Sequence, residues 1–600
     1  MQMRPLLLGF ATFLGASCAL AQSARLIDAY PAKARFAPSE PANLVIELNG
    51  KLEGTAKVSA TVWRLGKAAG ECGPVPLVPG SSNNLILSCS VPPEDFQGYL
   101  VTVRLTDANG RPFDERQTAI DVSSDWKRFP RYGYLAHYNS DEGTKPQIWV
   151  NELNRFHING LEFYDFQYRH DQPLAGTVAH AAASWKDIAA RTIDGATVTA
   201  LIDQAHRYNM MAMAYNVSYS AYDDVFSRQH DPLPLKWGTW NTPDGDRSAA
   251  TAKSLHLQAT DWSTKHLFYM NQNDLEWQKY LFGKMHDLLI VYPFDGWHID
   301  TFGERGAYAF DGTYVDYIAG FRSYIDHASA VLHKRIVMNA VNAMGQDYIA
   351  RSAADFVYSE LWEDHETFAS ILDTAEQVHL ANPQAGFVIA AYVNRREAQD
   401  RTQLAVKQFN LPSVLLTDAA IFASGAAHIE LGDGDRMLSS EYFPADTCTT
   451  VSPELQHSLR HYYDYLTAYE NYLRDGVTPA AVEIRIAGQR TDPLAVPNTV
   501  WTIARQKGDV TMVHLINLLG SDDPHWRDLG FNRPEPPLLK TLQVQIASTE
   551  NIRSIGWASP DVDGGQFHSI PFQIHKNGSI AWIEFTLPEL HYWDTVFLSQ

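Results

Sequence analysis

Cysteine is scarce in this sequence, with four residues in 600. No cysteine or histidine spacing resembles a zinc site, and no G-x-S-x-G turn for a serine nucleophile is present. The sequence therefore predicts neither a metal ion nor a cofactor. Cys72 and Cys89 lie in one segment of strand-like pattern and are expected to form a disulfide, whereas Cys448 is left over.

Basic residues are also few, with 48 Lys and Arg against 69 Asp and Glu and a net charge of -21. This balance argues against nucleic acid or an anionic membrane as a partner. Beyond the N-terminus no apolar run approaches the roughly 18 residues of a membrane span. We therefore expect no nucleic-acid partner and no membrane partner, and we expect a monomer.

The first residues resemble a secretory signal peptide. Arg4 precedes an apolar run, and Ala19-Leu20-Ala21 has the form of a cleavage site. We expect residues 1–21 to be removed and the protein to be secreted or periplasmic. A lipoprotein anchored at Cys18 is the alternative, disfavoured because Gly15 stands where a branched apolar residue is expected.

Aromatic residues are plentiful, with 15 Trp, 28 Tyr and 27 Phe. Most should pack in cores, although aromatic faces also serve as platforms for sugar rings. At 600 residues the chain is too long for one core. Residues 22–125 show short alternating runs and an Asn109-Gly110 hairpin signal, which predicts an N-terminal immunoglobulin-like β-sandwich.

Residues 126–476 change in pattern, because strand-like runs now alternate with helical ones. Eight strands are expected in RYGYLAHY, INGLEFYDF, MAMAYNVSY, FDGWHID, IVMNAVN, DFVYSE, GFVIAAYV and AHIEL. Eight such units predict a catalytic (β/α)8 TIM barrel. Residues 477–600 return to strand patterns and predict a C-terminal antiparallel β-sandwich. The fold class is therefore multidomain α/β plus β.

Acidic residues stand where several predicted barrel strands end, which is the face that carries the chemistry of such barrels. Asp165, Asp300, Glu360 and Glu430 hold these positions. Strand alternation should turn His298 and Asp300 into the barrel mouth and Trp297 toward the helices.

Each acid could instead cap the following helix. Two acids at one mouth among aromatic residues make that interpretation weaker, and paired carboxyl groups are what glycoside hydrolysis needs. A metal site built from His298, Asp300 and either Glu360 or His365 is a second alternative, which lacks a dense set of ligands.

Several blocks resemble one known family: EFYDFQYRHDQPLAG, MAYNVSYSAY, FDGWHIDTFG, NAVNAMG, DFVYSELWE, FVIAAYVN and LLTDAAIFASGAAHIELGDGDRML. Together they are similar to glycoside hydrolase family 66, which contains endo-dextranases and cycloisomaltooligosaccharide glucanotransferases. The resemblance implies a retaining mechanism on α-1,6-linked glucan, with Asp300 as nucleophile, Glu360 as general acid/base and Asp165 as a substrate-binding residue. Phe166 and Asp171 depart from the family pattern, which affects subsite contacts.

Other positions near strand ends are expected to contact substrate. These expected substrate-binding residues are Tyr164, His170, Asn216, His298, Asn342, Tyr358, Trp362, Asn394 and Glu430. For the histidines, a structural role at the barrel mouth is the alternative; Trp362 could instead pack a loop, and Glu430 could fix one.

An endo-acting dextran hydrolase (endo-dextranase) is the preferred function. The transferases of the family carry an extra carbohydrate-binding module within the barrel, for which the loops here leave little room. A cycloisomaltooligosaccharide glucanotransferase and a non-catalytic glucan-binding protein remain the alternatives. The expected partners are dextran and isomaltooligosaccharides.

Overall fold

The computed structural model describes residues 24–50, 55–140, 145–249, 256–257, 265–395, 407–434, 436–440, 449–548, 551–577 and 580–600. The expected signal peptide, residues 1–21, and Cys448 lie outside them. Within the described residues, no helix has the length and apolar character needed to cross a membrane.

Seven antiparallel strands form one sheet near the N-terminus, in the order β1-β2-β5-β4-β3-β6-β7. They are β1 (Arg25–Pro31), β2 (Ala42–Asn49), β3 (Ala56–Arg64), β4 (Lys67–Leu77), β5 (Asn84–Ser90), β6 (Gln97–Asp107) and β7 (Pro112–Val122). Alternate residues such as Leu44, Ile46, Val101 and Val103 point into one apolar core. The β-structure expected here is present, and its immunoglobulin-like type stays a prediction.

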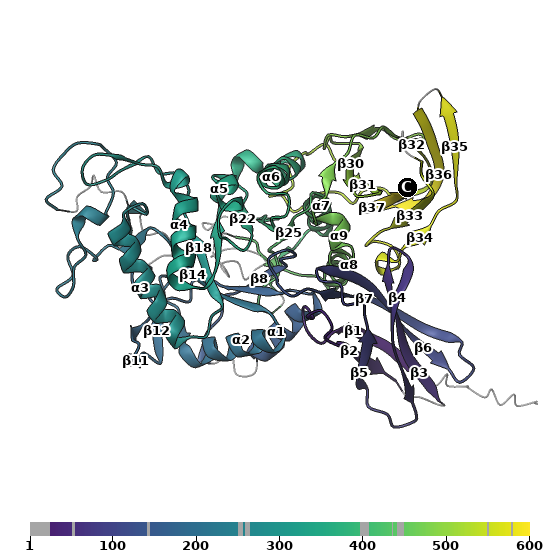
Figure 1. Cartoon of the computed structure of the whole chain (residues 1–600), viewed down its shortest axis with the longest axis horizontal. Coiled ribbons are helices and arrows are strands. Elements are labelled where there is room, and N and C mark those ends of the chain that lie inside the picture. Colours follow the sequence, from purple (N-terminus) through teal and green to yellow (C-terminus); the bar gives the residue numbers. More distant parts are fainter. Residues whose placement is uncertain are drawn as a thin grey trace, which may run out of the picture.

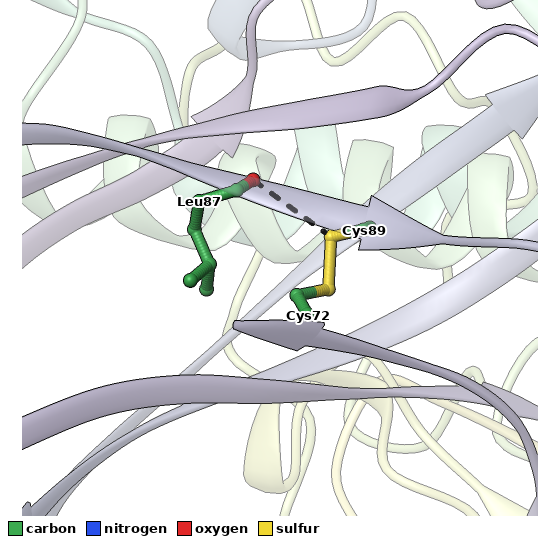
Figure 2. The surroundings of a disulfide bond; sticks show 3 residues. All are labelled: Cys72, Leu87 and Cys89. Atoms are coloured by element: carbon green, nitrogen blue, oxygen red, sulfur yellow. Dashed lines mark hydrogen bonds between the residues drawn. A yellow bond between two sulfur atoms is a disulfide. The ribbon is translucent and has the colours of Figure 1, made fainter. Parts of the chain in front are cut away.

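A disulfide joins Cys72 in β4 to Cys89 in β5, the two cysteines expected to pair (Figure 2). The two residues face each other across neighbouring strands and are buried in the core of the sheet. The bond therefore closes a loop of the chain within a single sheet.

Replacing both cysteines with alanine should lower the free energy of unfolding of this sheet by about 3 kcal/mol, because the unfolded chain gains the freedom that a closed loop of this length removes. The measurement is the midpoint of urea unfolding without reductant. Dithiothreitol should lower the midpoint of the parent protein and leave the double variant unchanged. Equal midpoints without reductant would contradict the expectation.

Eight parallel strands form the central sheet, in the order β25-β23-β22-β21-β18-β14-β9-β8. They are β8 (Tyr132–Leu135), β9 (Gly160–Phe163), β14 (Met211–Val217), β18 (Gly296–Asp300), β21 (Arg335–Asn339), β22 (Val357–Glu360), β23 (Phe387–Ala390) and β25 (Ala427–His428). The Tyr134 backbone N–H donates to Leu431 O at 3.1 Å, which joins the two edges. The predicted parallel barrel is confirmed, and each of the eight predicted runs overlaps one of its strands.

Helices surround this barrel (Figure 1). They are α1 (Lys145–Arg155), α2 (Gly195–Arg207), α3 (Leu275–Val291), α4 (Tyr317–Leu332), α5 (Gln346–Ala350), α6 (Phe368–Ala381), α7 (Leu411–Ala423) and α8 (Pro453–Ala468). Aspartate side chains cap the starts of α3 and α4. One face of α3, with Leu281, Met285 and Leu288, is fully buried against the barrel.

The long connection between β14 and β18 carries a small three-stranded sheet before α3. Its strands are β15 (Ser220–Tyr222), β16 (His256–Leu257) and β17 (Leu267–Tyr269). The backbone N–H of Ser218, at the start of this connection, donates to Asp300 O at 3.1 Å. The connection therefore begins beside the end of β18.

Two sheets form the C-terminal part of the chain. One contains β27 (Thr478–Pro479), β29 (Thr491–Asp492), β30 (Val500–Lys507), β31 (Val510–Asn517), β33 (Ser554–Ala558), β34 (His568–Ser569) and β37 (Trp593–Ser599). The other contains β28 (Ile484–Ile486), β32 (Leu539–Ser548), β35 (Phe572–Asn577) and β36 (Ile580–Leu590). Their apolar faces share one core, to which Val513 and Val544 belong.

The N-terminal sheet and the C-terminal sheets lie next to α8, on the same side of the barrel (Figure 1). Arg131, just before β8, is fully buried and binds Asp121 of β7 at 2.6 Å and Glu470 at 2.7 Å. Glu470 begins α9 (Glu470–Leu473), which follows α8. One buried guanidinium thus connects the N-terminal sheet, the barrel and the segment that leads to the C-terminal sheets.

Candidate active site

Two carboxyl groups end strands on the same rim of the barrel. Asp300 is the last residue of β18 and Glu360 the last of β22, with β21 between them. Asn339, the last residue of β21, contacts both. Its Nδ2 donates to Asp300 Oδ1 at 2.8 Å, and its Oδ1 accepts from the Glu360 backbone N–H at 3.3 Å. Asn339 therefore fixes the two acids relative to each other.

The Asp300 carboxylate accepts three hydrogen bonds. The Tyr215 hydroxyl donates to Oδ2 at 2.6 Å, while Asn339 Nδ2 and the Thr301 backbone N–H each donate to Oδ1 at 2.8 Å. Burial raises the pKa of Asp300, and these donors oppose that rise because they stabilise the charged form. The side chain is still partly exposed, so it can be reached from the barrel mouth.

The charged form of Glu360 is less well stabilised by hydrogen bonds than that of Asp300. The Tyr392 hydroxyl donates to Oε1, and Trp362 Nε1 donates to Oε2 over 3.4 Å. Burial, and then the charge of Asp300, raise the pKa of Glu360 to about 7. Of the two acids, Glu360 is thus the one that holds a proton near neutral pH.

The floor beneath the two acids is aromatic. The His298 ring stacks on Tyr132 and Tyr215 at 5.8 and 5.9 Å and meets the edge of Tyr358 at 4.8 Å. Trp297 instead packs against Phe282 of α3. The predicted alternation along β18 is therefore confirmed. Burial lowers the pKa of His298 to about 3, so this ring is neutral.

Asp165 follows β9 in a left-handed turn, with a φ of 47°. Burial raises its pKa to about 6, although the charge of Arg191 opposes the rise. The negative charge of Asp165 in turn raises the pKa of Asp300. Its neighbour Tyr164 packs on Tyr215 with ring centres 4.7 Å apart, so both residues stand beside the nucleophile candidate.

His170 and Asn216 are joined by two hydrogen bonds. His170 Nδ1 lies 2.8 Å from Asn216 Oδ1, and Asn216 Nδ2 donates to the His170 carbonyl at 2.9 Å. Asn216 is fully buried. The amide of Asn216 is thus used to hold His170, and a direct sugar contact by Asn216 stays a prediction.

Trp362 and Asn342 belong to the loops after β22 and β21. Asn342 Oδ1 accepts the Trp362 backbone N–H at 3.1 Å. The Trp362 ring stacks on Tyr392 at 5.0 Å and lies under the Arg527 guanidinium at 5.2 Å. These contacts fit the alternative role of Trp362, in which the ring packs a loop. The same side chain also hydrogen-bonds Glu360, and its contact with substrate stays a prediction.

Asn394 occupies a different position from the one expected. It is fully buried, and its Nδ2 donates to the Asp528 carbonyl at 2.8 Å while its Oδ1 accepts from the Asn410 backbone at 2.8 Å. Asp528 belongs to the loop between β31 and β32. Asn394 therefore attaches that C-terminal loop to the barrel, and the expectation of a substrate contact is corrected because both ends of its amide are used.

Glu430 also lies elsewhere. Tyr463 of α8 donates to its Oε1 at 3.0 Å, and its Oε2 lies 3.5 Å from His428 Nδ1. At 1% exposure it is closed off from solvent. Its contacts are with α7, α8 and His428, so the expectation that Glu430 lines the mouth is corrected. Among the described residues, Asp418, His428 and Glu430 form the cluster with the geometry to hold a metal ion.

Tyr215 and Tyr392 are site residues that the sequence interpretation missed. Each donates a hydrogen bond to one of the two acids. The signal was available, because Tyr215 lies two residues before the end of β14 and Tyr392 two residues after Ala390 of β23, both on the inward side by alternation. An acid at the end of a strand is a stronger signal of a catalytic site than a tyrosine, which usually packs in the core.

The arrangement places a charged carboxylate and a proton-holding carboxyl group side by side. The first can act as a nucleophile or a base, and the second as a general acid. Enzymes that cleave glycosidic bonds use such a pair of carboxyl groups.

Comparison with known proteins identifies one family. The family model "Glycosyl hydrolase family 66" matches residues 31–597. Two cycloisomaltooligosaccharide glucanotransferases of Niallia circulans are 26% and 25% identical to the chain, covering 87% and 95% of it and 66% and 72% of their own lengths. A dextranase of Streptococcus salivarius is 24% identical over 84% of the chain and 67% of its own length.

The chain thus spans about two thirds of the length of these curated relatives. A crystal structure of a Paenibacillus cycloisomaltooligosaccharide glucanotransferase in complex with cycloisomaltoheptaose has the same fold. Its TM-score is 0.86 at 23% identity, covering 96% of this chain and 100% of that chain. Because the family model extends over nearly the whole sequence, this protein belongs to glycosyl hydrolase family 66.

Proposed function

We propose that this protein is a secreted, endo-acting, retaining glycoside hydrolase that cleaves the α-1,6-glucosidic linkages of dextran. The main observation behind the proposal is that Asn339 holds two carboxyl groups whose charged forms are stabilised to different extents. Asp300 accepts three hydrogen bonds, whereas the pKa of Glu360 is raised to about 7. The names of the relatives support an α-glucan substrate.

In the first step, an Asp300 oxygen attacks the anomeric carbon while Glu360 gives its proton to the departing glucosyl oxygen. The carbon–oxygen bond of the linkage breaks, and an ester to Asp300 forms. In the second step, Glu360, now a carboxylate, takes a proton from water, whose oxygen attacks the same carbon. Asp300 is released and Glu360 is protonated again, so the configuration is retained after two inversions.

Residues around the two acids would bind the sugar. Asp165, Tyr164 and His170 stand at the rim beside Asp300, and we propose that they contact hydroxyl groups in the subsite where cleavage occurs. His298 and Tyr358, whose rings meet edge to face at 4.8 Å, would form the aromatic floor on which the sugar lies.

The proposal includes the division of the chain. Residues 1–21 would be a signal peptide, 22–125 an immunoglobulin-like sandwich, 126–476 the catalytic barrel and 477–600 a C-terminal sandwich. Export suits the substrate, since dextran is too large to enter a cell. We propose a monomer that acts without a cofactor.

Cyclising transfer is the second candidate, since relatives bear both names. Incubation of the purified protein with dextran, starch and pullulan, followed by chromatography of early products, separates the candidates. Linear isomaltooligosaccharides and rising reducing ends from dextran are the expected result. Cyclic products would favour the transferase, and tight binding without new reducing ends would favour a glucan-binding protein.

The pH profile of kcat/KM should fall as the pH rises through about 7, because Glu360 must be protonated to act as an acid. Replacing Tyr392 with phenylalanine removes a donor that stabilises the Glu360 carboxylate, so the pKa of Glu360 should rise further. The alkaline limb of the profile should then move to higher pH. Initial rates on dextran across a pH series measure this shift.

Tyr215→Phe is the matched control, since it removes the corresponding donor from Asp300. That change raises the pKa of Asp300, which must be ionised, so the acid limb should move to higher pH while the alkaline limb stays. If both variants moved the same limb, the assignment of roles to Asp300 and Glu360 would be wrong.

A further inference from the structure

A second group of buried acids lies outside the barrel mouth. His428 ends β25 and Glu430 follows two residues later, so both turn toward the helices, where Asp418 of α7 and Tyr463 of α8 meet them. Asp418, His428 and Glu430 are each at most 1% exposed. One ligand atom from each lies within 4.8 Å of the other two.

The charge of this group is not balanced by the protein. Among the described residues, the only ion-pair partner of Asp418 or Glu430 is His428, and neither acid meets a lysine or an arginine. With both acids ionised, Asp418 Oδ2 and Glu430 Oε2 have no hydrogen-bond donor. Two buried carboxylates without compensation are very unfavourable, so either protons or a cation must neutralise them.

The His428 ring is oriented so that one of its nitrogens faces the two carboxylates. Nε2 lies 2.9 Å from the Ala391 carbonyl, which can only accept, so Nε2 carries a hydrogen. In the neutral ring, Nδ1 then has a lone pair. That lone pair faces Asp418 Oδ1 at 2.8 Å and Glu430 Oε2 at 3.5 Å.

We propose that Asp418, His428 and Glu430 bind a divalent transition-metal ion such as Zn²⁺. Two carboxylates and a neutral imidazole around a dication give a site without net charge. Tetrahedral ligand atoms at about 2.0–2.2 Å from one zinc ion lie about 3.3–3.6 Å apart. His428 Nδ1 lies 2.8 Å from Asp418 Oδ1 and 3.5 Å from Glu430 Oε2, so the three side chains need only a small adjustment. The hydrogen bonds from His428 to Ala391 and from Tyr463 to Glu430 would orient the ligands from outside.

The ion would have a structural role. β25 is only two residues long and lies where the barrel closes, with a short register to β23. A metal bound by Asp418 on one side and by His428 and Glu430 on the other would attach this short strand to α7. The inference is independent of the proposed reaction.

The test is metal analysis of the full-length protein, purified without a metal-affinity column from medium containing zinc and manganese. About one divalent ion per chain is expected, and it should survive dialysis at neutral pH because the site is closed. The amide variants Asp418→Asn and Glu430→Gln should each lose the ion and unfold at a lower temperature. Protein free of metal, with a melting temperature that added Zn²⁺ or Mn²⁺ does not raise after refolding, would overturn the proposal.

The amide variants also distinguish protons from metal, since an amide resembles a protonated acid in shape. If two protons neutralise the cluster, these variants keep the parent melting temperature and the parent protein contains no metal. Asp594→Asn is the matched control, because Asp594 is fully buried, has a raised pKa and, within the part of the chain that the structure describes, belongs to no such cluster. It should leave the metal content unchanged.

Discussion

Asp300→Asn should lower kcat/KM on dextran by about 10⁴-fold or more, which corresponds to about 5.5 kcal/mol of barrier. The amide can still meet Asn339 and Tyr215, but it cannot form the ester to the sugar. Initial rates of reducing-end release measure the loss. In Asp300→Gly, azide should enter the space and attack from the nucleophile's side, giving a β-glucosyl azide.

Asp295→Asn is the control for this variant. Asp295 precedes the same strand at its opposite end, where its carboxylate accepts the Ala212 backbone N–H at 2.8 Å and meets His206 at 3.0 Å. Acids at that end of a barrel serve stability, so kcat/KM should stay within a few-fold of the parent value. If Asp300→Asn kept near-parent activity while remaining folded, Asp300 would not be the nucleophile.

Glu360→Gln should lower kcat/KM on dextran by about 10³-fold to 10⁴-fold, because the leaving glucosyl oxygen then departs without a proton. An isomaltosyl fluoride needs no such proton, so its rate of glycosyl-enzyme formation should fall far less. Stopped-flow release of fluoride measures this step.

Azide provides the complementary check on Glu360. In the glycine or alanine variant at this position, azide should replace water in the second step and yield an α-glucosyl azide, opposite in configuration to the product expected from Asp300→Gly. Equal losses on dextran and on the fluoride would mean that Glu360 does not act as the acid.

The barrel was predictable from sequence because its strands are short apolar runs that alternate with helical patterns. Alternation along β18 also gave the directions of Trp297 and His298, since a strand has a strict period of two. The same period of two along β14 places Tyr215 on the inward face. A tyrosine in a strand is most often part of the core, so its sequence position alone does not mark it as a site residue.

Contacts between distant segments were beyond the sequence. Asn394 stands near a strand end, as Asp300 and Glu360 do, yet its amide is hydrogen-bonded by a loop 134 residues later. The ring of Trp362 is approached by Arg527 from that same loop. Sequence position gives the rim of the barrel, but only packing decides which rim residues face the mouth and which hold the C-terminal part of the chain.

The Asp418, His428 and Glu430 cluster was missed for a related reason. Asp418 reads as a polar residue in a helix that is buried on every side, and Glu430 reads as a strand-end acid. Whether Glu430 faces inward depends on where β25 ends, and the strand is so short that alternation gives no firm phase. Only the packing of α7 and α8 shows that the two acids meet.

The guanidinium of Arg131 links the N-terminal sheet to the barrel, which affects whether the two can be separated. Because it lies between Asp121 and Glu470 with no exposure to water, a chain lacking the N-terminal sheet would keep a buried charge with half of its partners gone. The N-terminal sheet is therefore more than a detachable module: removing it should destabilise the barrel, because Arg131 would lose the carboxylate of Asp121.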